Sequence, residues 1–148
     1  MNFKESSSVE LKSIVNDDFK KEVIPFANTN GGGIYVGVDD NGVVVGVDKV
    51  MKKIGAIIRN GIKPDLTPYT SIDEQKADGK CIIKVTAMRG QKQPYHISDK
   101  GLKPSDVFVR HGGSSVTVTE EAIRTMLKET DGVTFVKTSM FFSTPLAK

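Results

Sequence analysis

Four carboxylates lie in two short stretches near the start of the chain: Glu5, Glu10, Asp39 and Asp40. Three carboxylates that meet at one point would bind Mg²⁺ or Mn²⁺ and could orient a water molecule for phosphodiester cleavage. An exposed strand face and an aspartate-rich hairpin turn explain the same residues without a metal. In one straight strand the odd spacing of Glu5 and Glu10 puts them on opposite faces, so they converge only if the intervening serines bend the chain. The pattern leaves both interpretations open.

A second set of residues could hold a polyanion. Its members are basic, hydroxyl-bearing or aromatic side chains: Arg89, Lys92, Tyr95, His96, Lys100, Lys103, Arg110, Ser114 and Ser115. Arginine and lysine neutralise phosphates, serine hydroxyls hold register, and a tyrosine ring can stack on an unpaired base. Residues 80–111 carry seven basic against two acidic side chains, within a chain whose net charge is +3. Such a local excess is typical of a polyanion-binding surface, although lysines that only solvate a surface explain the charge equally well.

Other chemistries find little support. The three glycines at 31–33 follow a predicted helix and precede a predicted strand, the reverse of the order that a dinucleotide-binding fingerprint requires. They therefore end the helix and let the strand pack closely, rather than cradle a phosphate. Two histidines and one cysteine, Cys81, are too few and too scattered to indicate a zinc site. No catalytic triad is visible.

The elements that must position these residues follow from hydrophobic periodicity and turn residues. We predict a strand over 9–12, a helix near 17–28 with an irregular second half at Pro25, a hairpin over 33–47, a helix from about 50 to 60 capped by Asp48, strands over 70–74 and 81–88, a strand over 107–110, and a helix that starts near Thr117 or Thr119 and ends at 131–132. Glu10 and Lys12 should share the outer face of the first strand. The pattern predicts an α+β fold with a mixed, largely antiparallel sheet and two to three packed helices.

Length and composition indicate one domain with a core of its own. We assign residues 1–132 to it, and residues 133–148 to a C-terminal tail that packs on the domain or leads into a further one. The chain has no membrane-length apolar run and no signal-peptide pattern, and its single cysteine cannot form an internal disulfide. The expected location is the cytoplasm, with no membrane partner.

Five blocks of sequence together resemble the Schlafen AlbA_2 family, which is regarded as a family of nucleic-acid-binding domains. They are ESSSVELK at 5–12, FANTNGG at 26–32, GVDDNG at 37–42, PYHI at 94–97 and VRHGGSS at 109–115. They occur in the family's order and span about residues 5–128. The resemblance implies an AlbA_2-like fold and, in bacterial members, an N-terminal module of a transcriptional regulator or an ATPase-like protein.

The resemblance also implies an activity. Vertebrate Schlafen proteins cleave tRNA and rRNA with two glutamates and an aspartate, and those roles fall here on Glu5, Glu10 and Asp40 as ligands of Mg²⁺ or Mn²⁺. That nuclease is built from two such lobes, so a single lobe would need to form a homodimer.

Three hypotheses result. The first is a homodimeric nucleic-acid-binding domain of a transcriptional regulator that needs no cofactor and contacts the phosphate backbone of DNA or RNA through residues 89–115. The second is a metal-dependent endoribonuclease, and the third is a protein–protein or dimerisation module.

Overall fold

The computed structural model describes residues 3–98 and 103–130. The predicted tail at 133–148 and Lys100 lie outside these residues. The strands and labelled helices follow one another as β1 (Val9–Lys12), α1 (Lys20–Ala27), β2 (Gly32–Val36), α2 (Met51–Gly61), β3 (Ile62–Lys63), β4 (Thr70–Ala77), β5 (Lys80–Ala87), β6 (His96–Ile97), β7 (Phe108–His111) and β8 (Ser114–Thr117). A further helix covers 120–130, and short 3-10 turns lie at Asp17–Phe19, Thr67–Tyr69 and Pro104–Asp106.

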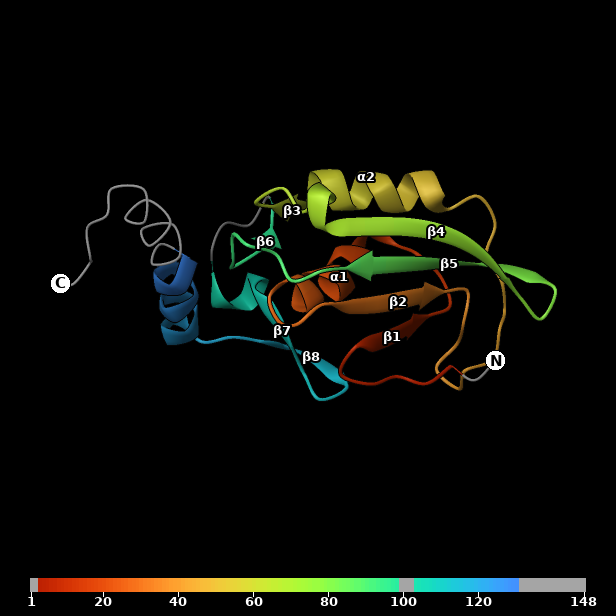
Figure 1. Ribbon diagram of the computed structural model, residues 1–148, viewed down its shortest axis with the longest axis horizontal. Helices are drawn as coiled ribbons and strands as arrows, with labels where there is room; N and C mark the ends of the chain where they lie inside the picture. The colour runs from red at the N-terminus through yellow and green to blue at the C-terminus, as the bar shows by residue number, and fades with distance from the viewer. Residues whose placement is uncertain (1–2, 99–102, 131–148) are drawn as a thin grey trace, which may run out of the picture.

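A four-stranded sheet with the order β1-β2-β5-β4 forms the centre of the molecule (Figure 1). β1 and β2 run parallel, whereas β2, β5 and β4 pair antiparallel. Two small antiparallel ribbons, β3–β6 and β7–β8, flank it. The predicted α+β class with a mixed, largely antiparallel sheet is therefore confirmed.

One face of the sheet is covered by α1 and α2. Alternation along the strands points Ile34 and Val36 of β2, with Ile83 and Val85 of β5, into one buried cluster with both helices. The residues of α1 from 23 to 27 are all buried, so the second half of this helix is enclosed on every side, whereas its first three residues are half-buried. Each large apolar side chain buried in this way contributes about 1.5–3 kcal/mol, which makes this face the main source of stability.

The opposite face is covered only in part. At the end of the sheet near the β4–β5 turn, Leu11, Val38, Val44, Ala77 and Ile82 form a second, smaller cluster. Nearer the glycines, where β2 begins, no helix of the described residues lies over the strands (Figure 1). None of the described helices has both the length and the apolar character that crossing a bilayer requires.

Several predicted boundaries shift for local reasons. The first helix begins as a 3-10 turn capped by Asn16, whose side chain accepts a hydrogen bond from the Asp18 N–H at 3.0 Å. The predicted hairpin over 33–47 is reduced to one bridge between Val38 and Val44. Gly37, at a φ of +101°, ends the strand where a left-handed residue cannot continue the ladder.

Two predicted helix starts have different outcomes. Asp48 does not cap α2, because that helix starts at Met51 and Val50 holds the cap position. At the last helix, the Ala122 N–H donates to the Thr119 hydroxyl at 3.1 Å, so of the two candidate caps Thr119 is the one used.

Candidate functional site

Arg110 lies inside the protein rather than on its surface. Its side chain is 1% exposed and forms an ion pair with Glu10. The guanidinium donates to the carbonyl oxygens of Ser6 at 2.9 Å and Val9 at 3.0 Å, and it stacks 4.9 Å from the centre of the Phe26 ring. We predicted a phosphate contact for this arginine, and in this structure that prediction is wrong. Arg110 instead joins the β7–β8 ribbon to β1 and α1.

The partners of Arg110 correct two further expectations. Glu10 and Lys12 do share one face of β1, but that face is turned toward α1: Lys12 lies 3.6 Å from Glu22 of that helix. Ser115 uses its hydroxyl to accept a hydrogen bond from Arg110 at 3.2 Å, so it supports the buried arginine. Burial raises the pKa of Glu22 above its ordinary value, and the neighbouring Lys12 opposes that rise.

The predicted convergence of carboxylates occurs in part. The serine segment bends, since the Ser6 N–H donates to the Val9 carbonyl at 3.0 Å, and Glu5 thereby reaches Glu10. The hydrogen bond between these side chains, together with burial and the negative charges of Glu10 and Asp40, raises the pKa of Glu5 from 4.5 to about 7. At neutral pH the Glu5 carboxyl is therefore protonated for part of the time.

These carboxylates do not form a metal site as they stand. Within residues 3–98 and 103–130, no cluster of three or more acidic, histidine or cysteine side chains is arranged to hold a metal ion. Glu10 is already neutralised by Arg110. Asp39 has a structural role, because its carboxylate accepts hydrogen bonds from the N–H groups of Asn41 and Val43 at 2.9 and 3.0 Å.

Tyr95, predicted to stack on a base, is fully buried. Its hydroxyl accepts a hydrogen bond from the Lys92 N–H at 3.1 Å, and its own N–H donates to the Asn28 side chain at 2.7 Å. Asn28 also donates to the carbonyl oxygens of Tyr95 and Phe108 at 3.0 and 2.9 Å. This buried amide fixes three chain segments together, so the ring is unavailable to a ligand and the stacking prediction is wrong in this structure.

The other basic residues of the set remain on the surface. Arg89, Lys92 and Lys103 are exposed, as is Ser114 at the tip of the β7–β8 ribbon, and His96 is half-buried beside β3. Of all the predicted residues, only Arg89 lines the pocket that the open face contains.

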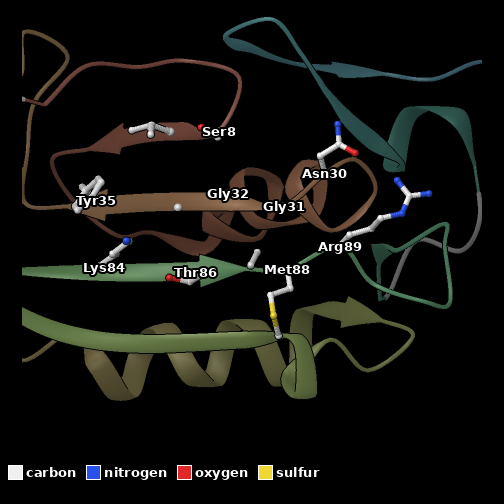
Figure 2. A pocket seen from close by; sticks show the side chains of 12 residues that line it. Ser8, Asn30, Gly31, Gly32, Tyr35, Lys84, Thr86, Met88 and Arg89 are labelled. Atoms are coloured by element: carbon white, nitrogen blue, oxygen red, sulfur yellow. The ribbon is translucent and has the colours of Figure 1, made fainter.

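That pocket, of about 420 Å³, lies over the first residues of β2 (Figure 2). Its floor is the backbone of Gly31, Gly32 and Gly33. Its polar lining comes from Ser8, Asn30, Tyr35, Lys84, Thr86 and Arg89. None of the described residues that line it is acidic. Two cations with no carboxylate between them form an environment that favours an anion.

The register of the sheet explains how the pocket arises. Gly33 pairs with Thr86 and Tyr35 pairs with Lys84, so these four residues share the open face. A Cβ atom on Gly33 would point into the pocket, 3.3 Å from the Lys84 Cε atom. Because glycine has no side chain there, the strand surface is hollow.

The two cations occupy opposite ends of the hollow (Figure 2). At one end Lys84 lies 5.5 Å from the centre of the Tyr35 ring, and at the other Arg89 donates to the Thr29 carbonyl at 2.7 Å. In the part of the chain that the structure describes, neither cation forms an ion pair. Their charge is therefore available to a ligand at both ends.

Sequence reasoning missed Lys84, Thr86, Asn30 and Ser8 as lining residues. A signal was present for two of them, because the alternation in Lys84-Val85-Thr86 places Lys84 and Thr86 on one face of a strand. For Ser8 no local signal exists, since its approach depends on β1 lying parallel to β2, whereas Asn30 directly precedes the glycines of the pocket floor.

Comparison with known proteins shows what this chain is similar to. A family model described as "Schlafen, AlbA_2" matches residues 3–119. Among solved structures, the N-terminal domain of a Nitrosomonas europaea protein named as a RecG-related ATP-dependent DNA helicase is similar, with a TM-score of 0.58 and 25% identity over 76% of this chain and 83% of that one. The DIP2311 protein of Corynebacterium diphtheriae aligns with a TM-score of 0.61 and 20% identity over 76% of this chain. This chain covers 22% of the length of that protein.

Proposed function

The chain belongs to the Schlafen AlbA_2 family, and from this premise we propose that it is a nucleic-acid-binding domain whose open sheet face holds the phosphate backbone. The observation that carries the proposal is the pocket lined by Lys84 and Arg89 without an acidic residue among its described lining. Each phosphate that a lysine or arginine neutralises releases condensed counterions, which supplies affinity without reading sequence.

The comparisons support this proposal at a coarse level. The family and the RecG-related domain both point toward nucleic acid. The matched region is only 22% of the DIP2311 protein, so the activity of that whole protein is not carried over to this chain. We further propose that this domain serves a transcriptional regulator and acts as a homodimer, which would offer two pockets to one nucleic acid.

Exposed Arg89 and Lys92 extend the site along the connection after β5. An arginine is suited to phosphate because its planar guanidinium donates two parallel hydrogen bonds. Arg89 already uses one nitrogen on the Thr29 carbonyl, which fixes its direction at the end of the pocket. We therefore expect Arg89 to contribute more than Lys92, whose ammonium is a flexible point charge.

The test is fluorescence anisotropy with labelled RNA and DNA at several salt concentrations. We expect binding without strong sequence preference that weakens steeply between about 50 and 200 mM salt. Arg89→Glu and Lys84→Glu should each reduce affinity at least about tenfold, because a repulsive charge replaces an attractive one beside the phosphate.

The matched control is Arg124→Glu. This arginine is 72% exposed, pairs only with Glu120 among the described residues, and is not a lining residue of the pocket. Equal losses in all three variants would reflect net charge alone and would contradict a site at the pocket. A folded wild-type protein that binds no nucleic acid would instead favour the protein–protein module.

Metal-dependent RNA cleavage by Glu5, Glu10 and Asp40 stays a prediction. The bend at the serines favours it, because it brings two of the three carboxylates together. The donor set does not fit a divalent ion in this arrangement, since Glu10 is neutralised by Arg110, and we derive no catalytic step from it.

The nuclease test compares RNA integrity with and without Mn²⁺ in the wild type and in Glu5→Gln, with Glu74→Gln on exposed β4 as control. Cleavage that only Glu5→Gln abolishes would make the chain an enzyme. Intact RNA in every sample would leave it a binding domain.

A further inference from the structure

We infer that the pocket at the start of β2 takes one unpaired nucleotide, so that the domain prefers single-stranded over double-stranded nucleic acid. This inference rests on the proposed function and specifies the ligand of the same site. It goes beyond backbone contact, because it assigns the interior of the pocket to a base and its sugar.

The shape of the pocket suits an unpaired nucleotide better than a duplex. Phosphates on a rigid duplex can approach cations at the rim of a recess, but stacked and paired bases cannot turn out into it without first being unpaired, which costs free energy. A rim contact would leave a hollow of about 420 Å³ empty. That volume lies within the range of about 300–1,000 Å³ that is usual for sites that enclose small organic ligands. A single nucleotide is the repeating unit of nucleic acid that matches it.

The pocket lining includes apolar surfaces that suit a base. Tyr35 offers a half-exposed ring at one end, and Met88, 54% exposed, offers a polarizable thioether on the lower edge (Figure 2). Both are surfaces on which a base can stack or pack regardless of its identity. The apolar contacts therefore suit a base, whereas a bare phosphate would gain nothing from them.

Two polar side chains of the pocket can form hydrogen bonds with the edge of a base. Within the described residues, no other group engages the amide of Asn30 or the hydroxyl of Thr86. An amide and a hydroxyl can each both donate and accept, which matches the mixed donors and acceptors on the edge of a base. With Arg89 beside Asn30, a phosphate and a base edge can be held at the same time.

A free nucleotide and a nucleotide within a strand carry the same chemistry. The experiment therefore contains both: a labelled single strand, a labelled duplex of the same sequence, and an unlabelled nucleoside monophosphate as competitor. We expect the single strand to bind at least about tenfold more tightly than the duplex, since stacking of one base is worth roughly that factor. The monophosphate should compete only at high concentration, because it lacks the neighbouring phosphates.

Gly33→Val tests the pocket itself. The new side chain would occupy the hollow, and the atom nearest to its Cβ is the mobile Cε of Lys84 at 3.3 Å. Valine also favours a strand, so the fold should persist. We expect single-strand affinity to fall much more than duplex affinity, so that the preference for the single strand is lost.

Tyr35→Leu is a second variant that leaves the pocket open but removes the ring. It should also lower single-strand affinity more than duplex affinity. Thermal unfolding of each variant checks that a loss of binding is not a loss of fold.

The outcomes separate the two proposals. A single-strand preference that Gly33→Val removes supports the inference. Equal single-strand and duplex binding, unaffected by Gly33→Val and Tyr35→Leu, would overturn it and leave the proposed function standing. Tight binding of the free monophosphate with no binding of either polymer would overturn the proposed function, and with it the assignment of the pocket to a strand.

Discussion

On the helix-covered side of the sheet, Arg110 is enclosed by Glu10, two carbonyl oxygens and the Phe26 ring, and its side chain is 1% exposed. On the open side, Arg89 is exposed and the structure records no ion pair for it among the described residues. Both arginines belong to the basic stretch 80–111, and sequence reasoning treated them alike. Their surroundings give them opposite roles.

The difference follows from the cost of removing charge from water. A buried guanidinium must be paired with an opposite charge and hydrogen-bonded, or its desolvation outweighs any gain. The two terminal nitrogens of Arg110 donate to Glu10, Ser115 and two carbonyl oxygens, and its Nε, which has no partner among the described residues, is buried where a phosphate cannot reach it. An exposed arginine with one anchoring bond keeps most of its donors for a ligand. Burial, not residue type, therefore divides the basic residues into those that hold the fold and those that can bind.

The largest expected effect is on the covered side. Arg110→Ala removes one member of a buried ion pair and leaves Glu10 and two carbonyl groups without their donor, so unfolding free energy should fall by about 3–5 kcal/mol. Denaturant titration measures it. As a control, Arg124→Ala removes an arginine that is 72% exposed and should change little. A comparable small loss at Arg110 would show that its pairing is not structural.

Two adjacent glycines test the two faces directly. A Cβ atom on Gly32 would lie 2.5 Å from the Phe26 ring and 2.6 Å from the Ser8 carbonyl, so Gly32→Ala should cost about 1–3 kcal/mol. The atom nearest to a Cβ on Gly33 is the Lys84 Cε atom at 3.3 Å, on a flexible side chain that can move aside, so Gly33→Ala should be neutral or stabilise by up to about 1 kcal/mol. Thermal or denaturant unfolding compares them. Equal losses of stability in Gly32→Ala and Gly33→Ala would contradict a pocket that is open at Gly33.

The pH dependence of stability tests the glutamate pair. Folding raises the pKa of Glu5 from 4.5 to about 7, so the folded state binds that proton more tightly than the unfolded state. The resulting stabilisation is complete below the unfolded pKa and disappears as pH rises through the folded pKa. Glu5→Gln cannot ionise, so at about pH 8 it should unfold at higher denaturant concentration than the wild type, and the difference should vanish in acid. A pH-independent difference would place Glu5 away from Glu10.

The smallest expected effect concerns a rival basic surface. Residues 49–63 carry five basic and no acidic side chains, and α2 within that stretch covers the face opposite the pocket. Arg59→Gln should leave nucleic-acid affinity within about twofold, because at physiological salt a charge beyond about 8 Å is largely screened. If Arg59→Gln lost as much nucleic-acid affinity as Arg89→Glu, the result would indicate that nucleic acid binds at α2.

Much of the fold was predictable because its signals are local. The first strand, 9–12, coincides with β1. Between β4 and β5, Asp78 and Gly79 both have positive φ, and both are residue types that favour such a turn. The first strand of the β7–β8 ribbon was displaced by one residue, since its ends are set by pairing with β8 and not by the local pattern. Helix starts were less certain, because Asp48 and Thr119 look equally suitable as caps.

The site was predictable only where it is made of neighbours along the chain. Convergence of Glu5 and Glu10 was expected if the serines bent, and they do. Tyr95 and Arg110 were misassigned because burial is decided by segments far away, namely Asn28 and Glu10. The acidic residues elsewhere in the first half of the chain also concealed the basic run at 49–63.

By itself the sequence determined the class of fold, the helix that ends shortly before the glycines, the strands with their alternation, and membership of a family, because each depends on short-range preferences or on ordered motifs. Only the tertiary structure decided which basic residues are buried, that Gly33 and Thr86 adjoin across two strands, and that a pocket opens above them. Those properties depend on strand register and on which face the helices cover, and both are set by contacts between residues far apart in the chain.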